Sequence, residues 1–263
     1  MTAELLRWPR ASPRAASRML LRNATLYRRS WRRNLLPNFF EPLLYLLSLG
    51  FGLGLYIGRE IGNVEYVRFI APGLAAAAAM NGAIFEVTYN VFVKLRFAHL
   101  YDAVITTPLE PEDVALGELG WAVTRSLIYG MAFLLVMLAL GYVQSPWAVA
   151  APVAIALIGL AFATLGMIYT MLIPQIDLFS YFFTLVITPL FLFSGIFFPF
   201  ENLPAAARWL GWLTPLHHGV ELLRSLVLSG APAAAAGHAL WLAGFSALLF
   251  PPAVNLFRRR LIV

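Results

Sequence analysis

The feature that most constrains this chain is an apolar run from Leu178 to Phe200 that contains no charged residue. A helix of this length crosses the hydrocarbon core of a bilayer, which is about 30 Å thick. The run ends in the aromatic cluster FLFSGIFFPF at residues 191–200, and a half-polar segment follows at residues 205–228. That segment is too polar to cross a membrane alone and too apolar for an ordinary loop. The order predicts a spanning helix followed by an amphipathic piece that dips back on one side of the membrane.

Five further apolar stretches indicate that the whole chain is embedded in the membrane. Hydrophobic residues make up 60% of the 263 residues and charged residues only 12%, whereas a soluble domain carries about 25% charged residues. We therefore expect an all-α integral membrane protein that forms a single transmembrane domain over residues 1–263. The six predicted transmembrane helices are residues 38–58, 69–93, 119–142, 147–173, 178–198 and 238–257.

The placement of basic residues orients these spans. Nine arginines fall within residues 1–33, where Glu4 is the only acid, and Lys94 is the only lysine of the chain. With both termini and the loop 94–118 on one side, that side holds fourteen of the nineteen basic residues. The positive-inside rule then predicts a multi-pass protein of the inner (plasma) membrane, with both termini and this loop in the cytoplasm. The basic balance follows from topology, so we expect the lipid bilayer and no nucleic acid as a partner.

The first 58 residues carry two further patterns. Residues 1–37 form a basic cytoplasmic segment in which apolar residues and arginines alternate at loosely helical spacing over 17–36. This predicts an amphipathic interface helix on an anionic leaflet, with a disordered basic tail as the alternative. In the first span, Gly50, Gly54 and Gly58 are spaced by four. The spacing favours close helix packing, with a substrate-lining groove as the alternative.

Two ionisable residues fall inside neighbouring predicted spans. Glu86 precedes the cytoplasmic end of its span by about eight residues, and Arg125 follows the start of the next by about seven, so both lie about 10–12 Å deep. A lone charge in lipid costs several kcal/mol. We therefore predict a Glu86–Arg125 ion pair, with separate snorkelling to the surface as the alternative.

Other patterns limit the chemistry that this chain can perform. Cysteine is absent, so no disulfide or thiol chemistry is expected. His217 and Glu221 lie one helical turn apart, but His218 points elsewhere and the pattern is not H-E-x-x-H. Hydrogen bonding is therefore favoured over metal binding. A P-loop needs a lysine after glycine, whereas Lys94 follows Val93. We expect no catalytic residue, no metal and no cofactor bound by this chain.

Several segments together resemble the permease subunits of ABC-2 type exporters. They are the basic N-terminal helix, the six spans, TTPLEPEDVALGE at residues 106–118, SGIFFPFENLP at residues 194–204 and LTPLHHGVELLR at residues 213–224. Within that family the chain looks closest to the nodulation J-type permeases. The segments that carry this finer resemblance are PQIDLFSYFFTLVITPLFLFSG at residues 174–195, GELGWAVTRS at residues 117–126 and RRRL at residues 258–261.

The resemblance implies an assembly and a function. Two copies of the permease pair as a homodimer, and two separate ATPase subunits, which hold ATP and Mg²⁺, dock underneath. The expected substrate is a lipid-linked or amphiphilic glycan, such as a lipo-oligosaccharide, moved outward, with drug or lipid export as the alternative. A coupling helix within residues 97–107 fits an ATPase cleft, and its candidate residues are Phe97, Leu100, Tyr101, Asp102, Val104 and Thr107.

The same resemblance makes residues 199–237 an outer gate that dips back into the membrane as a re-entrant helical hairpin between spans five and six. Its two short helices are expected at about 204–213 and 215–228. The candidate gate or substrate-path residues are Phe193, Phe197, Phe198, His217 and Glu221. The aromatic side chains suit stacking on sugar faces or contact with acyl chains, and an interfacial aromatic belt is the alternative. Two functions from other classes are the alternatives to an exporter. A membrane-embedded lipid-modifying enzyme would need polar residues clustered at one membrane face. A structural assembly factor is the third class.

Overall fold

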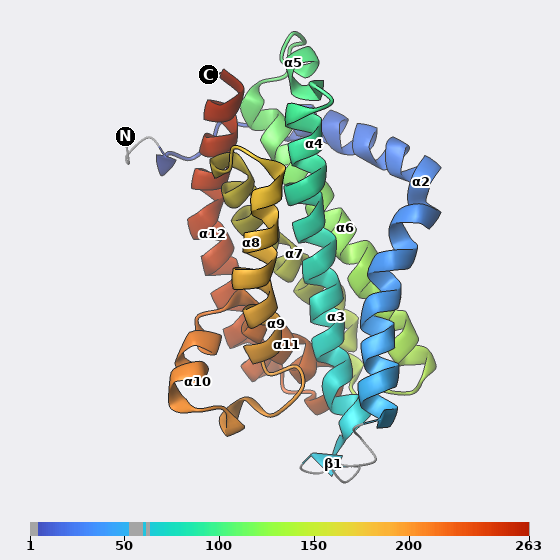
Figure 1. Cartoon of the computed structure of the whole chain (residues 1–263). Coiled ribbons are helices and arrows are strands. Elements are labelled where there is room, and N and C mark those ends of the chain that lie inside the picture. Colours follow the sequence, from blue (N-terminus) through green and yellow to red (C-terminus); the bar gives the residue numbers. More distant parts are fainter. Residues whose placement is uncertain (1–4, 53–59, 62–63, 263) are drawn as a thin grey trace.

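The structure, a computed structural model, describes residues 5–52, 60–61 and 64–262 and is almost entirely helical (Figure 1). Within these residues the only strands are β1 (Glu60–Ile61) and β2 (Val64–Glu65), which pair antiparallel with Glu60 opposite Glu65 and Ile61 opposite Val64. Five described helical segments are long and apolar enough to cross a membrane. The chain is therefore a multi-pass all-α membrane protein.

Each of these five segments overlaps one predicted span. They are Tyr66–Arg96, Pro111–Ala139, Pro146–Leu172, Ile176–Phe193 and Pro232–Ile262. The remaining predicted span, 38–58, is described only as far as residue 52. Residues 53–58, which include Gly54 and Gly58, lie outside the described residues. The count of six spans and the glycine-packing interpretation both stay predictions.

The predicted interface helix and the start of the first span belong to one helix. Helix α2 runs from Pro13 to Leu47 and continues as a π-helical turn, Ser48–Gly52. It covers all of residues 17–36 and passes without a break into the predicted span. Its ribbon crosses one end of the molecule and then bends along the bundle (Figure 1). The sequence places Pro37 and Pro42 in its second half, and proline is the usual cause of a helix kink.

The second span lies at the centre of the bundle. It consists of α3 (Tyr66–Phe85), a π-helical turn (Glu86–Asn90) and α4 (Val91–Arg96). Helix α3 packs against α2, α6, α7 and α11, and its five-alanine run is buried. A Cβ added at Gly82 would lie 2.5 Å from the Tyr129 ring and 2.8 Å from the Arg125 carbonyl oxygen. The missing side chain lets α6 approach α3 closely.

Helix α6 (Pro111–Ala139) begins eight residues before the predicted start of its span at residue 119. Pro111 occupies the first turn, where its missing N–H is tolerated. A capping box precedes the helix, because the Glu110 backbone N–H donates to Asp113 Oδ2 over 3.2 Å and the Glu110 side chain accepts in return from the Asp113 backbone. Residues 111–118, assigned to the loop 94–118 by sequence, are therefore helical.

The third to fifth spans follow the predicted order. Helix α7 (Ala151–Leu172) follows a 3-10 turn at Pro146–Ala150. The next span ends at Phe193 instead of residue 198, because Gly195 adopts φ +84°, a left-handed conformation that stops a helix. Its parts are a 3-10 turn Ile176–Leu178, α8 (Phe179–Phe182), a π-helical turn Phe183–Ile187 and α9 (Thr188–Phe193).

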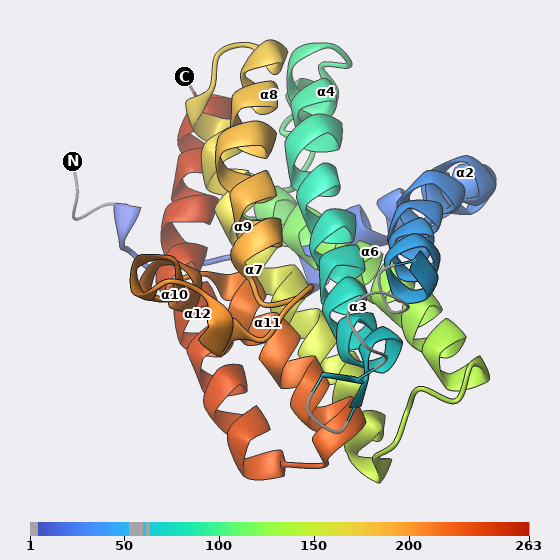
Figure 2. The ribbon, with the colours of Figure 1, turned by 60° about the horizontal axis from the view of Figure 1, so that its bottom comes forward.

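The segment between spans five and six contains two short helices close to the predicted bounds. A 3-10 turn, Phe200–Asn202, leads to α10 (Ala205–Trp212) and α11 (Pro215–Arg224), which continues as a π-helical turn Ser225–Ser229. Helix α12 (Pro232–Ile262) completes the bundle. Helix α11 packs among α3, α7 and α12, whereas α10 lies outside these helices (Figure 2).

The two ends of the bundle differ. Both described chain ends and α5 (Leu100–Val104) lie at one end, which we call the terminal end (Figure 1). Helix α10 and the β1–β2 ladder lie at the opposite end, which we call the hairpin end (Figure 1). The loop 94–118 is thus at the same end as the termini.

Candidate functional site

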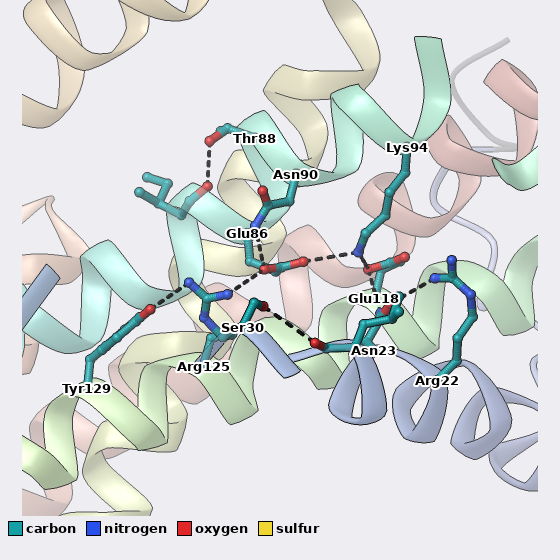
Figure 3. A network of polar contacts seen from close by, with 12 residues as sticks. Arg22, Asn23, Ser30, Glu86, Thr88, Asn90, Lys94, Glu118, Arg125 and Tyr129 are labelled. Atoms are coloured by element: carbon teal, nitrogen blue, oxygen red, sulfur yellow. Dashed lines mark hydrogen bonds and ion pairs between the residues drawn. The ribbon is translucent and has the colours of Figure 1, made fainter. Parts of the chain in front are cut away.

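Four charged side chains meet inside the bundle and form what we call the charge cluster: Glu86, Lys94, Glu118 and Arg125 (Figure 3). Lys94 Nζ lies between the two acids, 3.0 Å from Glu86 Oε1 and 2.8 Å from Glu118 Oε2. Arg125 Nη1 lies 3.2 Å from Glu86 Oε2. Two acids and two bases therefore neutralise one another.

Uncharged side chains also donate hydrogen bonds to the carboxylates of Glu86 and Glu118. Asn90 Nδ2 donates to Glu86 over 2.7 Å. Glu118 accepts from Asn23 Nδ2 over 3.0 Å and from the Tyr101 hydroxyl over 2.9 Å. These donors come from the π-helical turn, from α2 and from α5, whereas Glu118 lies on α6. The charge cluster and its hydrogen-bond donors therefore connect four elements at one point: α2, the second span, α5 and α6.

Burial makes this arrangement energetically consequential. The Glu118 and Glu86 side chains are 0% and 2% exposed, and Arg125 is 5% exposed. A buried charge that loses its partner costs about 3–5 kcal/mol. Burial, followed by the negative charge of Glu118, raises the pKa of the Tyr101 phenol well above its usual value, so Tyr101 stays a hydrogen-bond donor at neutral pH.

The structure brings the predicted pair Glu86 and Arg125 together, and Arg125 does not snorkel, because its guanidinium is buried over the Tyr27 ring at 4.8 Å. Sequence reasoning missed that Lys94 and Glu118 share the site. Two spacings in the sequence could have indicated the shared site. Glu86, Asn90 and Lys94 follow one another at intervals of four residues, and Glu118 lies seven residues before Arg125. Both spacings place side chains on one face of a helix.

The predicted coupling residues divide into two sets. Phe97, Asp102 and Thr107 are exposed at the terminal end, and Phe97 is 65% exposed. Leu100 and Val104 pack partly against the core. Tyr101 is fully buried and points toward Glu118. In this conformation Tyr101 has no exposed surface and holds α5 on α6, and its role in ATPase coupling stays a prediction.

The predicted gate residues on α11 hold the hairpin end together. His217 is buried, stacks on Phe200 with ring centroids 3.8 Å apart, and contacts the Ser194 carbonyl oxygen through Nδ1 at 3.2 Å. Glu221 forms an ion pair with Arg224. Arg224 Nη2 in turn donates to the Gly195 carbonyl over 2.9 Å. These contacts tie α11 to the loop that follows α9.

A histidine pair that the sequence did not predict connects α11 to α12. His218 Nε2 lies 2.8 Å from the Trp212 carbonyl oxygen, so Nε2 carries the proton and donates. His218 Nδ1 then accepts from His238 Nδ1 over 2.9 Å. Burial lowers the pKa of His218 to about 4, with smaller contributions from the neighbouring His217 and His238. Within the described residues no group of three metal-capable side chains is found.

A cavity of about 770 Å³ opens between the second and fifth spans and the end of α2. Its wall is mainly aromatic and aliphatic, and the predicted gate residues Phe197 and Phe198 belong to it. Asn81 and Asn202 supply amide groups within this wall. Phe193, the remaining predicted residue, is half exposed at the end of α9. A cavity of this kind suits an amphiphile, because most of its surface is apolar and a few groups can form hydrogen bonds.

Taken together, the helical spans, the paired charges and the apolar cavity define a polytopic membrane protein. Residues 15–228 match the family model described as ABC-2 type transporter. The chain is 37% identical over 241 residues to Nodulation protein J of Rhizobium leguminosarum bv. trifolii, with 92% of each chain covered. It is 36% identical over 251 residues to Nodulation protein J of Bradyrhizobium diazoefficiens, covering 91% of this chain and 95% of the relative.

A more distant relative is the Inner membrane transport permease YadH of Escherichia coli, 25% identical over 198 residues, with 75% of this chain and 77% of the relative covered. The family match and the 37% identity over nearly the whole chain show that this protein belongs to the ABC-2 type transporter family. The resemblance to nodulation J-type permeases is confirmed as well.

Proposed function

We propose that this chain is the permease subunit of an ATP-binding cassette exporter that moves a lipid-linked or amphiphilic glycan outward. The observation that carries the proposal is the cavity of about 770 Å³ between the second and fifth spans. Its aromatic wall suits acyl chains and sugar faces, and the amides of Asn81 and Asn202 suit sugar hydroxyls. Membership of the transporter family and the identity to nodulation J proteins support this assignment.

Energy for transport is assigned to a separate subunit. The only lysine, Lys94, lies in the charge cluster and follows Val93 instead of a glycine-rich loop. We infer two ATPase copies that bind ATP and Mg²⁺ beneath a homodimer of this permease. The single transmembrane domain then lies in the inner membrane with the terminal end in the cytoplasm, in keeping with the arginine placement.

The coupling contact is assigned to the exposed residues of the terminal end. Phe97 exposes its side chain just before α5, and Asp102 exposes its side chain on α5 itself. Tyr101 instead connects α5 to Glu118 on α6. A force on α5 from a bound ATPase would therefore reach the charge cluster directly. The two acids of the charge cluster, Glu86 and Glu118, are buried and paired with cations, so the cluster itself supplies no free acid for a membrane-embedded lipid-modifying enzyme.

Drug or lipid export by the same family is the second candidate, because few polar groups line the cavity. The two candidates differ in what they require from the amides. A glycan needs the hydrogen bonds of Asn81 and Asn202, whereas a purely apolar drug or lipid tail does not.

The test uses the permease purified with its own ATPase from its native membranes and reconstituted in proteoliposomes. Acylated oligosaccharide should stimulate ATP hydrolysis, and the deacylated sugar should not. Asn81→Leu should abolish most of this stimulation, while Leu240→Ala on the exposed face of α12 should not change it. Phe97→Ala should weaken retention of the ATPase without changing the melting temperature.

Repeated purification without any bound ATPase would remove the exporter assignment. Stimulation by hydrophobic drugs that survives Asn81→Leu would move the substrate class to drugs or lipids.

A further inference from the structure

A second pocket lies at the terminal end and combines an apolar floor with a cationic rim. Its volume is about 610 Å³. Three arginines and three aliphatic side chains line it: Arg96, Arg259, Arg260, Leu95, Met171 and Leu256. It is separate from the aromatic cavity, with which it shares no lining residue.

The pocket sits where three spans end. The second span ends at Arg96, the fourth at Leu172 and the last at Ile262. These ends mark the level at which a lipid headgroup meets the helices. Arg260 is fixed at this level, because its Nη2 donates to the Ile173 carbonyl oxygen over 3.0 Å and so caps α7. Its remaining N–H groups stay available for an anion.

Cationic side chains outnumber acidic ones among the residues that line the pocket. Three of the lining residues are arginines and one is Asp102, whose carboxylate lies 3.0 Å from Nδ1 of His99, another lining residue. Arg96 is exposed and forms no ion pair within the described part of the chain. A guanidinium fork matches the geometry of phosphate oxygens.

We propose that this pocket binds one anionic phospholipid of the leaflet that faces the terminal end. Its phosphate rests on Arg96, Arg259 and Arg260, and the first methylenes of its acyl chains rest on Leu95 and Met171. A free phosphate would use the rim but leave the apolar floor uncovered, whereas a phospholipid matches both. Basic pockets between spans on the cytoplasmic side are typical sites for anionic headgroups.

The test is native mass spectrometry of the full chain in mild detergent, titrated with phosphatidylglycerol or with phosphatidylcholine. The wild type should retain one phosphatidylglycerol per chain and no phosphatidylcholine. Each arginine near a headgroup changes affinity by about fivefold. Arg96→Gln should therefore weaken binding about fivefold, and R96Q/R259Q/R260Q about a hundredfold. Because the Arg96 side chain is exposed, Arg96→Gln should leave the fold intact. Its result therefore remains informative even if the triple variant does not fold.

The matched control is R18Q/R28Q/R29Q, which removes three exposed arginines from α2 and leaves the pocket intact. It should keep the retained lipid. Equal loss in this control, or full retention by the pocket variants, would overturn the proposal. Displacement of the lipid by 10 mM inorganic phosphate, roughly a saturating concentration for a weak anion site, would assign the pocket to a soluble phosphate instead. Unchanged lipid binding with lost ATPase retention would make it part of the ATPase contact and also refute the proposal.

Discussion

Replacing Arg125 by methionine should destabilise the protein strongly, because the substitution removes a buried cation from a neutralised cluster. Arg125 Nη1 lies 3.2 Å from Glu86 Oε2, and both side chains are almost fully buried. At that separation the attraction is about 5 kcal/mol with an effective dielectric constant of about 20. Lys94 and Asn90 still contact Glu86 in the variant. The net loss should therefore fall at the lower end of the 3–5 kcal/mol range for a broken buried pair, at about 3 kcal/mol.

The measurement is the midpoint of thermal unfolding in detergent, supported by an SDS titration. On the scale of soluble proteins of similar length, a loss of about 3 kcal/mol lowers the midpoint by about 6–12 °C. The matched control is Arg68→Met. The Arg68 side chain is 37% exposed and pairs at 3.3 Å with Glu65, which is 49% exposed, and exposed pairs contribute about 0–1 kcal/mol.

The decisive variant is E86Q/R125M. It removes both charges of the pair and leaves Lys94 with Glu118, 2.8 Å away. The cluster is then neutral again, so the double variant should recover at least about half of the stability that Arg125→Met loses. A double variant that is no more stable than Arg125→Met would show that packing, and not charge neutralisation, sets the cost.

Three other perturbations test separate contacts by the same melting assay. Gly82→Ala should lower stability by about 1–3 kcal/mol, because the added Cβ would overlap α6. In the control Gly244→Ala the added Cβ meets nothing within 4 Å, so stability should stay unchanged or rise slightly. Equal effects of the two substitutions would contradict the close approach of α3 and α6. Tyr101→Phe should cost about 2 kcal/mol, since it removes a donor from the buried Glu118 carboxylate, and an unchanged midpoint would show that water replaces the hydroxyl. His218 has a folded-state pKa of about 4, below its ordinary 6.5, so the unfolded chain takes up the proton first and this residue lowers stability by about 2 kcal/mol on acidification from pH 7 to pH 5. His218→Asn should reduce the slope of stability against pH by this amount, and an unchanged slope would place the titration elsewhere.

The order of the spans follows from the sequence because each apolar run is long enough to cross a bilayer and is bounded by polar residues. Boundaries were less accurate where a helix begins with polar residues. The sequence PEDVALGE suggests a loop by composition, yet Pro111 at the first turn and the reciprocal bond of Glu110 and Asp113 start a helix there. Capping chemistry, not hydropathy, sets that boundary.

The candidate sites were predictable only in part. Glu86 and Arg125 attract attention because each is a charge within an apolar run. Lys94 and Glu118 lie near the predicted span ends, where charges are ordinary, so only their spacing relative to Glu86 and Arg125 indicates a shared site. The bond between His218 and His238 joins helices whose relative rotation no local pattern specifies.

The charge cluster has a consequence for how the protein enters the membrane during synthesis. Glu86 precedes its partner Arg125 by 39 residues, so the ribosome delivers the acid to the insertion machinery first. A charged side chain at the centre of a lone inserted helix costs about 2.5–3.5 kcal/mol. Because α3 and α6 neutralise each other only when both are present, the second and third spans should leave the insertion channel together as a hairpin, and a nascent chain cut between them should fail to integrate stably.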